Sequence, residues 1–360
     1  MTGRRLRVLA APDKFRGTAD AHEIAVAVRD AVEALGGSCR VLPLADGGEG
    51  TLEALGGANR VTRVTGPLGT PVDAPWRLDQ DSGVAVVEMA RASGLLLAGG
   101  AAGNDPLRAT TWGTGELVVA ATSQGAREIV ICLGGSATTD GGYGALEVIL
   151  SSREWQDRAE RGTPPRLTAC CDVATTFVDA AAVFAPQKGA SPAQVAQLTD
   201  RLRDLAARYS REFGVDVTQV AGTGAAGGLA GALLALGARL RPGFDTVARQ
   251  VGLREALAWC DLVITGEGRL DSESLNGKVV GGVVEEARGA GKQVVAIVGD
   301  RAADVVVPDD VTVVSLSERY GRTRALADPA ALTSQVVTEH LTAGSAGATE
   351  CVVPPHHNEI

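Results

Sequence analysis

Short apolar runs alternate with amphipathic stretches at the start of this chain. The run Leu6–Ala11 predicts a buried strand, and apolar residues at helical spacing predict a helix over Asp20–Leu35. Gly36 and Gly37 end that helix, and Cys39–Leu44 predicts a second strand. This strand–helix–strand order is typical of an open α/β sheet, whose ligands bind beyond the carboxyl ends of the strands.

The pattern changes between Val61 and Leu97. Short alternating runs separated by Gly, Pro and Asp predict antiparallel strands there. A helix at Gly115–Gln124 and a strand at Glu128–Leu133 follow. The middle of the chain therefore favours a mixed α/β domain.

The second half returns to alternating helices and strands. Pro192–Phe213 predicts a helix with a solvated polar face, and Gly227–Gly237 a small buried helix. The remaining predicted elements are, in chain order, helix Asp245–Trp259, strand Asp261–Thr265, helix Lys278–Ala290, strands Gln293–Val298 and Val311–Leu316, and helix Pro329–Ala343 with Asp328 as N-cap.

These elements predict two α/β domains. A Rossmann- or flavodoxin-like parallel-sheet domain is built from both chain ends, residues 1–60 and 246–345, with 105–135 as a candidate addition. A second, mixed α/β domain, 61–245, is inserted between them. Residues 346–360 are expected to form a flexible tail.

Composition narrows the possible partners. The 360-residue chain carries a net charge of −9 and only 3% aromatic residues, so we expect no nucleic-acid partner. Six cysteines without a C-x-x-C pair indicate reduced thiols. No apolar stretch resembles a signal peptide or a membrane span, so we expect a cytoplasmic protein, monomeric or homodimeric, that does not enter a membrane.

Three glycine-rich segments combine with acidic and hydroxyl side chains: 45–51, 133–142 and 265–272. Glycine lets backbone amides converge on phosphate oxygens, and nearby carboxylates bind Mg²⁺ or accept a proton from a hydroxyl. Together these groups indicate phosphoryl transfer. The chain has no G-x-x-x-x-G-K-[ST] segment, so the phosphate site would not be a P-loop.

The first segment offers a proton acceptor. Asp46 directly follows a strand and is a candidate general base or metal ligand, with a turn-forming role as the alternative. Thr51 either binds phosphate or caps a helix, and Glu49 either faces the site or solvent. Asp13 and Lys14, after the first strand, are candidates for catalysis and charge neutralisation.

The other segments offer phosphate and metal ligands. Asp140 is a catalytic candidate or a helix cap, and Glu267 and Asp271 either bind Mg²⁺ or pair with Arg269. Lys188 and Lys278 are secondary candidates. The predicted substrate- and phosphate-binding residues are Gly47, Gly48, Glu49, Thr51, Gly134, Gly135, Ser136, Thr138, Gly224 and Gly227.

Gly222–Gly227 also satisfies G-x-G-x-x-G, with Asp245 downstream, which leaves an NAD-dependent dehydrogenase as an alternative. A helix N-terminus facing phosphate, or a structural helix contact, explains the same glycines without NAD.

Taken with their neighbours, the glycine segments resemble the type I glycerate kinases. The similar stretches are APDKFRGT (11–18), PLADGGEGT (43–51), GPLGTPV (66–72), VEMARASGL (87–95), GTGEL (113–117), LGGSATTDGG (133–142), FAPQKGAS (184–191), GTGAAGG (222–228) and VITGEGRLDSESLNGK (263–278). The resemblance implies ATP- and Mg²⁺-dependent phosphorylation of D-glycerate, in most type I members at the 2-hydroxyl, with the active site between two α/β domains.

Residues 151–182 depart from that family pattern. The polar stretch Ser151–Arg166 is shortened, and 172–182 lacks the Asn-Pro and glycine positions of the family. Ala181 and Ala182 stand where the family has glycine, so we expect this region to reshape the acceptor pocket. The alternatives are a catalytically weak or inactive ligand-binding relative, or a kinase for a related small hydroxy acid.

Overall fold

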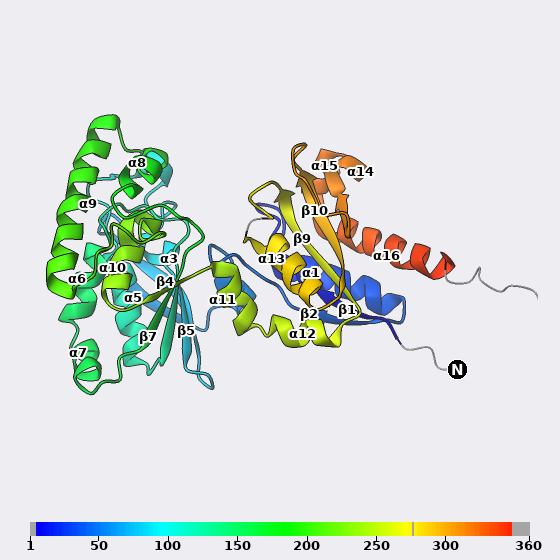
Figure 1. The fold of residues 1–360 in the computed structure, drawn as a ribbon, viewed down its shortest axis with the longest axis horizontal. Coiled ribbons are helices and arrows are strands. Elements are labelled where there is room, and N and C mark those ends of the chain that lie inside the picture. The colour runs from blue at the N-terminus through cyan, green and yellow to red at the C-terminus, as the bar shows by residue number, and fades with distance from the viewer. Residues whose placement is uncertain (1–4, 276, 348–360) are drawn as a thin grey trace, which may run out of the picture. The chain divides into compact units, whose positions relative to one another are not determined.

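The computed structural model describes residues 5–275 and 277–347, and it divides into two compact units (Figure 1). Unit 1 spans Met1–Leu44 and Gly252–Ile360, and unit 2 spans Ala45–Val251. Unit 2 therefore includes 45–60 and 246–251, which the sequence reading placed with the chain ends, and it also includes 105–135. Apart from 346 and 347, the predicted tail 346–360 lies outside the described residues.

Unit 1 contains a five-stranded, fully parallel sheet in the order β11-β10-β9-β1-β2. The strands are β1 (Arg7–Ala10), β2 (Ser38–Val41), β9 (Leu262–Leu270), β10 (Gln293–Arg301) and β11 (Val311–Ser315). The first strand pairs with β2 on one side and with β9 on the other. The two ends of the chain thus share one sheet, as the sequence predicts.

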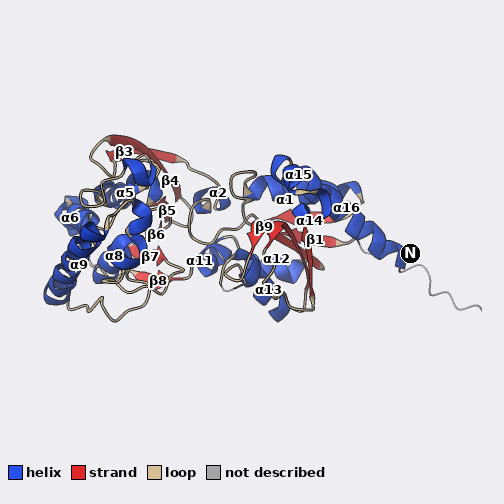
Figure 2. Ribbon diagram, turned by 90° about the horizontal axis from the view of Figure 1, so that it is seen from above, coloured by secondary structure: helices blue, strands red, loops and turns tan. Residues whose placement is uncertain are grey.

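Helices cover both faces of this sheet: Figure 2 shows α1 and α16 on one side and α12 and α13 on the other. The helix α1 begins after Asp20, whose side chain and that of Glu23 form a capping box. Its apolar side pairs with α16 over a buried core that includes Ile24 and Val336. The helices of unit 1 are α1 (Ala21–Ala34), α12 (Leu253–Trp259), α13 (Val279–Gly289), α14 (Leu316–Tyr320), α15 (Arg322–Ala327) and α16 (Pro329–Gly347).

Unit 2 contains a six-stranded sheet in the order β3-β4-β5-β6-β7-β8. Its strands are β3 (Arg60–Thr65), β4 (Pro71–Asp79), β5 (Val84–Glu88), β6 (Glu128–Cys132), β7 (Arg166–Cys170) and β8 (Arg239–Arg241). The first three are antiparallel neighbours, and β5 through β8 are parallel. The predicted antiparallel strands are confirmed as β3, β4 and β5, and β5 joins them to the parallel strands β6, β7 and β8.

Alternate side chains of β6 pack into hydrophobic cores on the two faces of the sheet. Ile129 and Ile131 pack into a core formed with helices α5, α6 and α10, whereas Val130 and Cys132 pack with Leu52 of α2. The helices of unit 2 are α2 (Thr51–Ala54), α3 (Ala90–Ser93), α4 (Gly100–Gly103), α5 (Trp112–Ser123), α6 (Tyr143–Ser151), α7 (Arg153–Glu160), α8 (Ala180–Phe184), α9 (Pro192–Phe213), α10 (Leu229–Ala235) and α11 (Gly243–Gln250), with 3-10 turns η1 (Pro186–Lys188) and η2 (Ala225–Gly228).

The structure corrects two predicted elements. The single helix predicted over Asp245–Trp259 is two helices, α11 and α12, because the backbone takes a left-handed conformation (φ 72°) at Gly252, the first residue after the boundary between the units. The third glycine-rich segment is largely strand, since β9 continues through Leu270 and pairs with β10 up to Arg301. The sequence reading also missed α7.

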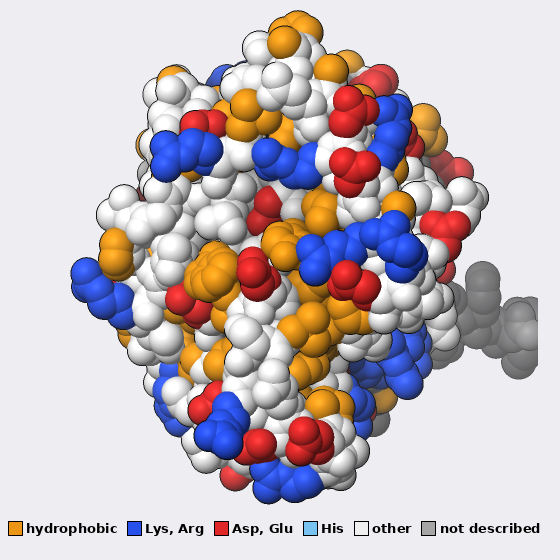
Figure 3. Space-filling view, turned by 90° about the vertical axis from the view of Figure 1, so that its left-hand side faces the viewer, with side chains coloured by type: hydrophobic (Ala, Val, Ile, Leu, Met, Phe, Trp, Pro, Cys, Tyr) orange, Lys and Arg blue, Asp and Glu red, His pale blue; other side chains and the backbone are white. Residues whose placement is uncertain are grey.

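The predicted solvated helix Pro192–Phe213 is α9, with the same bounds. Figure 3 looks onto this side of unit 2, where Lys, Arg, Asp and Glu side chains are interspersed instead of forming one basic patch. Among the described residues, no helix combines the length and apolar character needed to cross a bilayer.

Candidate active site

The first glycine-rich segment opens unit 2 as a tight loop that ends in α2. Gly47 and Gly50 adopt φ values of 82° and 93°, which other residues rarely take. The Oδ1 atom of Asp46 accepts a hydrogen bond from the amide of Gly48 at 3.1 Å, and the buried hydroxyl of Thr51 donates to the carbonyl of Gly48 at 2.8 Å. The loop is therefore held in shape by its own side chains, while Glu49 is exposed.

Glu88, at the carboxyl end of β5, holds this loop in place by hydrogen bonds with its backbone amides. Its Oε1 atom accepts from the amides of Gly50 and Leu52, both at 3.0 Å, and its Oε2 atom accepts from Arg91 at 3.0 Å. The carboxylate is 2% exposed and lies at the start of α2, where backbone amides favour a negative charge. Sequence reasoning missed Glu88, although its place at the end of an apolar run was a usable signal.

The second glycine-rich segment follows β6 and approaches the first. A Cβ atom at Gly134 would lie 3.1 Å from the Cα of Gly48, so the two backbones are in contact. The amides of Gly134, Gly135 and Ser136 donate no hydrogen bond to any group in the described part of the chain. Consecutive amides left unpaired in a glycine-rich turn form a concave site for an anion.

Lys188 lies buried beneath this turn. Its ammonium donates to the hydroxyl of Ser136 at 2.8 Å and to the carbonyl of Thr138 at 2.6 Å. Burial lowers the pKa of Lys188 to about 7, and the nearby Asp140 opposes that shift. Because the Ser136 oxygen accepts from Lys188, its own hydrogen is available to donate outward. The sequence reading ranked this lysine as secondary, since its burial is a tertiary property.

The carboxylate of Asp140 is 9% exposed and already held by several donors. Its Oδ2 atom accepts from the amide and hydroxyl of Thr111, both at 2.8 Å, and its Oδ1 atom accepts from the amide of Gly142 at 3.1 Å. These bonds place it just before α6, whose N-cap residue is Gly142. As a neighbour of Lys188, it acts on the anion site through charge.

The G-x-G-x-x-G glycines are buried against backbone. A Cβ at Gly224 would lie 2.3 Å from the carbonyl oxygen of Thr176, and one at Gly227 would lie 2.0 Å from that of Thr138. No strand occurs in the residues immediately before this turn, 215–221. Both observations favour the structural explanation of these glycines over a dinucleotide site.

Unit 1 gathers acidic side chains at the carboxyl ends of its strands. One oxygen of Glu267, Oε1, is buried and accepts no hydrogen bond from the described residues. Burial raises the pKa of Glu267 to about 7, and the Asp13 and Asp271 carboxylates add to that rise while Ser274 and Lys278 oppose it. Asp13, Glu267 and Asp271 therefore form an acidic cluster with an unsatisfied acceptor.

The neighbours of this cluster are basic and hydroxyl groups. The Lys14 ammonium lies 4.0 Å from Asp13, and Lys278 lies 3.1 Å from Glu273. The Oδ1 atom of Asp271 accepts from the amide and hydroxyl of Ser274, and this turn lowers the pKa of Asp271. Ser274 was not singled out from the sequence.

The unsatisfied Glu267 oxygen is a candidate ligand for Mg²⁺. No group of three or more His, Cys, Asp or Glu residues in the described ranges is arranged to hold a metal ion. Mg²⁺ on a nucleotide needs only one or two carboxylates, because water and phosphate oxygens complete its shell. Glu267, with Asp13 or Asp271, fits that smaller requirement.

In the divergent region 151–182, the two alanines singled out from the sequence lie in α8. Ala181 is buried in α8 and packs with Leu198 and Leu202 of α9, so its methyl group fills core instead of lining a ligand site. Ala182 is exposed on the same helix. Residues Asp172–Ala174, by contrast, are exposed after the carboxyl end of β7.

Comparisons with known proteins show the family of this chain. The glycerate kinase family model matches residues 8–160 and 149–342, and its two matches meet in the divergent region. Glycerate 2-kinase of Escherichia coli is 40% identical over 84% of this chain and 87% of its own length. Glycerate kinase of Bacillus subtilis is 37% identical over 83% of this chain and 86% of its own length.

A solved structure agrees as well. The crystal structure of a candidate glycerate kinase 2 from Salmonella typhimurium LT2 superposes with a TM-score of 0.83 at 34% identity, covering 96% of this chain and all of that one. Both the sequence and the fold therefore match over most of the chain, and ATP as phosphate donor follows from the kinase assignment. This chain belongs to the glycerate kinase family.

Proposed function

We propose that this kinase transfers the γ-phosphoryl group of ATP to the 2-hydroxyl of D-glycerate, giving 2-phosphoglycerate. The bond from the hydroxyl oxygen to the γ-phosphorus forms as the bond from that phosphorus to the bridging oxygen of ADP breaks. The hydroxyl proton passes to a carboxylate. The observation that carries the proposal is the set of unpaired amides of Gly134, Gly135 and Ser136 above the buried Lys188 ammonium.

In unit 2 these groups would hold an anionic oxygen. Three amides, the outward hydroxyl of Ser136 and the Lys188 charge supply the donors that a phosphate or substrate carboxylate requires. We assign Asp46 as the general base, because it is partly exposed near the start of its loop and its Oδ1 atom, not its Oδ2 atom, accepts from Gly48. Thr51, Glu88 and Asp140 would keep the loops in position.

In unit 1 the acidic cluster would hold Mg²⁺. Glu267 and Asp13 or Asp271 are its expected ligands, and Lys14 and Lys278 would balance charge at the nucleotide phosphates. Bound there, Mg²⁺ would neutralise charge on the phosphates. Binding would also relieve the cost of burying the Glu267 carboxylate beside two others.

The decisive experiment measures ADP release by the purified protein with a panel of small hydroxy acids, using the Escherichia coli relative as a positive control. We expect D-glycerate to be the best acceptor, and ³¹P NMR of the product to show a phosphate on the 2-oxygen. ADP release that is the same with and without every hydroxy acid would overturn the proposal. A phosphate on the 3-oxygen would overturn its regiochemistry.

A further inference from the structure

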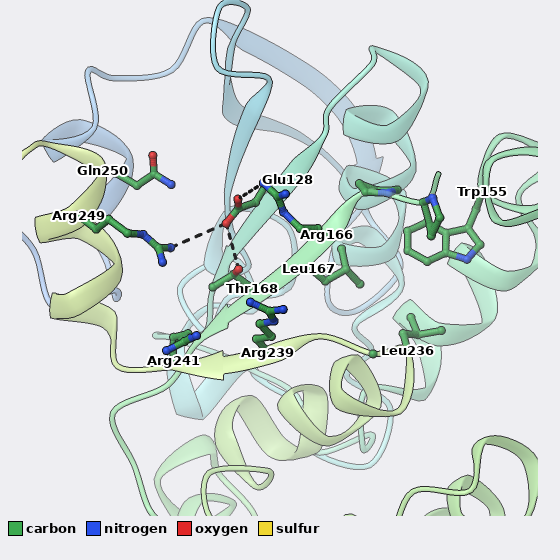
Figure 4. A pocket seen from close by; sticks show the side chains of 13 residues that line it. Glu128, Trp155, Arg166, Leu167, Thr168, Leu236, Arg239, Arg241, Arg249 and Gln250 are labelled. Carbon is green, nitrogen blue, oxygen red and sulfur yellow. Dashed lines mark hydrogen bonds and ion pairs between the residues drawn. The ribbon is translucent and has the colours of Figure 1, made fainter. Parts of the chain in front are cut away.

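A second polar pocket, of about 520 Å³, opens at the opposite edge of the unit 2 sheet (Figure 4). Its floor is the amino-terminal part of β6 and β7 together with β8, whereas the glycine-rich loops follow the carboxyl ends of the strands. The side chains that matter come from Glu128, Arg166, Thr168, Arg239, Arg241 and Arg249. This pocket therefore shares no lining residue with the candidate active site.

Strand register explains why arginines gather here. The pairs are Glu128 with Arg166 and Thr168 with Arg239, on neighbouring parallel strands. Because alternate residues of a strand share a face, Arg241 points to the same side as Arg239. Arg249 reaches the pocket from α11, as Figure 4 shows.

The pocket has far more positive than negative charge. Glu128 is its only carboxylate, and it is already engaged by Arg166 at 3.1 Å, by Thr168 at 3.2 Å and by Arg249 at 4.0 Å. Neither Arg239 nor Arg241 has a carboxylate within 4.0 Å in the part of the chain that the structure describes. The pocket thus has four guanidinium groups and one carboxylate, in a chain whose net charge is −9.

We propose that this pocket binds a small phosphorylated molecule. Arginine presents a planar fork of donors that matches phosphate oxygens, and a phosphate monoester carries nearly two negative charges at neutral pH. The excess of three positive charges favours a ligand that carries more than one negative charge. The pocket volume lies within the range of small-molecule sites, and the half-buried Leu236 at its far end provides an apolar contact for an organic part.

Arginine footprinting tests the site directly. Phenylglyoxal modification of Arg239 and Arg241 is followed by peptide mass spectrometry, with and without inorganic pyrophosphate, in EDTA to keep Mg²⁺ out. We expect pyrophosphate to slow modification at both positions several-fold. Sodium chloride at equal ionic strength should not protect them, and Arg211, exposed on α9 with no ion pair among the described residues, should react at the same rate throughout.

Calorimetry on variants completes the test. Arg239→Gln combined with Arg241→Gln should weaken pyrophosphate binding at this site at least ~10-fold, because two charge-assisted contacts are lost. Arg211→Gln is the matched control and should bind like the unmodified protein. Unchanged footprints with pyrophosphate, equal protection by sodium chloride, or protection by citrate but not by pyrophosphate would each overturn the proposal.

Discussion

Asp46 combines a loop-forming bond with an accessible carboxylate. Its Oδ1 atom accepts from Gly48, and asparagine can keep that bond while losing the basicity of a carboxylate. We therefore expect Asp46→Asn to lower kcat at least ~10²-fold, the scale of losing a general base, with little change in melting temperature. Steady-state kinetics and thermal unfolding of the same sample decide this. Near-normal kcat with a lower melting temperature would show a turn-forming role instead.

Lys188 should make stability depend on pH in a recognisable direction. Its pKa is about 7 in the folded protein and 10.5 ordinarily, so below pH 7 it is charged in both states and the full burial cost applies. As the pH rises from 7 toward 10.5, the unfolded chain holds the proton more often than the folded one. Stability then rises, by at most about 1.4 kcal/mol per pH unit.

Lys188→Met isolates that effect. The variant fills similar space without a titrating group. Between pH 7 and 9.5, the free energy of unfolding of the unmodified protein should therefore rise relative to that of the variant. Urea unfolding at several pH values measures the difference. Parallel curves for the two proteins would show that Lys188 does not titrate in this range.

Glu267 should show the opposite dependence. Its folded pKa of about 7 exceeds its ordinary 4.5, so the folded state favours the protonated acid. Stability from this group is present below pH 4.5 and is lost as the pH rises to 7. Glu267→Gln should therefore melt a few degrees higher than the unmodified protein at pH 8, with the difference vanishing near pH 4.5. An equal or lower melting temperature at pH 8 would contradict the burial of an unpaired carboxylate.

At the scale of elements, α11 supports the Asp46 loop. The amide of Gly243, its first residue, donates to Asp172 at 2.7 Å, and a Cβ on Gly243 would lie 1.8 Å from the carbonyl oxygen of Asp46. Gly243→Ala must displace either the helix or the loop. We expect kcat to fall at least ~10-fold, because in-line transfer tolerates little misplacement of its groups.

A glycine in another helix provides the control. Gly289 lies at the end of α13, where a Cβ would meet nothing within 4 Å. Gly289→Ala should leave kcat unchanged and stabilise the protein by up to ~1 kcal/mol. If Gly243→Ala also leaves kcat unchanged, the contact between α11 and the Asp46 loop has no part in catalysis.

Elements also separate what was predictable from what was not. The helix Pro192–Phe213 was predicted with its observed bounds, because Ser191, Pro192 and Gly214 mark its ends locally. The third glycine-rich segment was read as a loop, yet Gly266 and Gly268 lie in β9. They are small because the Ile297 carbonyl and the backbone of Phe15 and Arg16 approach them closely. That crowding comes from residues distant in sequence.

At the scale of the whole molecule, activity should need every component at once. We expect ADP release only when ATP, Mg²⁺ and D-glycerate are all present, since the acidic cluster needs a cation before it can face nucleotide phosphates. A coupled assay with each component omitted in turn measures this. Robust turnover in excess EDTA would exclude a required metal, and ATP hydrolysis without glycerate would show that water competes as acceptor.

Local patterning was sufficient for the α/β class, for the joining of both chain ends in one sheet and for the positions of the glycine-rich segments, because strand and helix periodicities and turn residues act over a few neighbours. The tertiary structure alone determined that Lys188 lies buried under Ser136, that Glu88 holds the first loop, that Glu267 keeps an unsatisfied oxygen and that four arginines share one pocket. Burial and charge proximity depend on which distant segments meet, and desolvation then sets the pKa and affinity of each group.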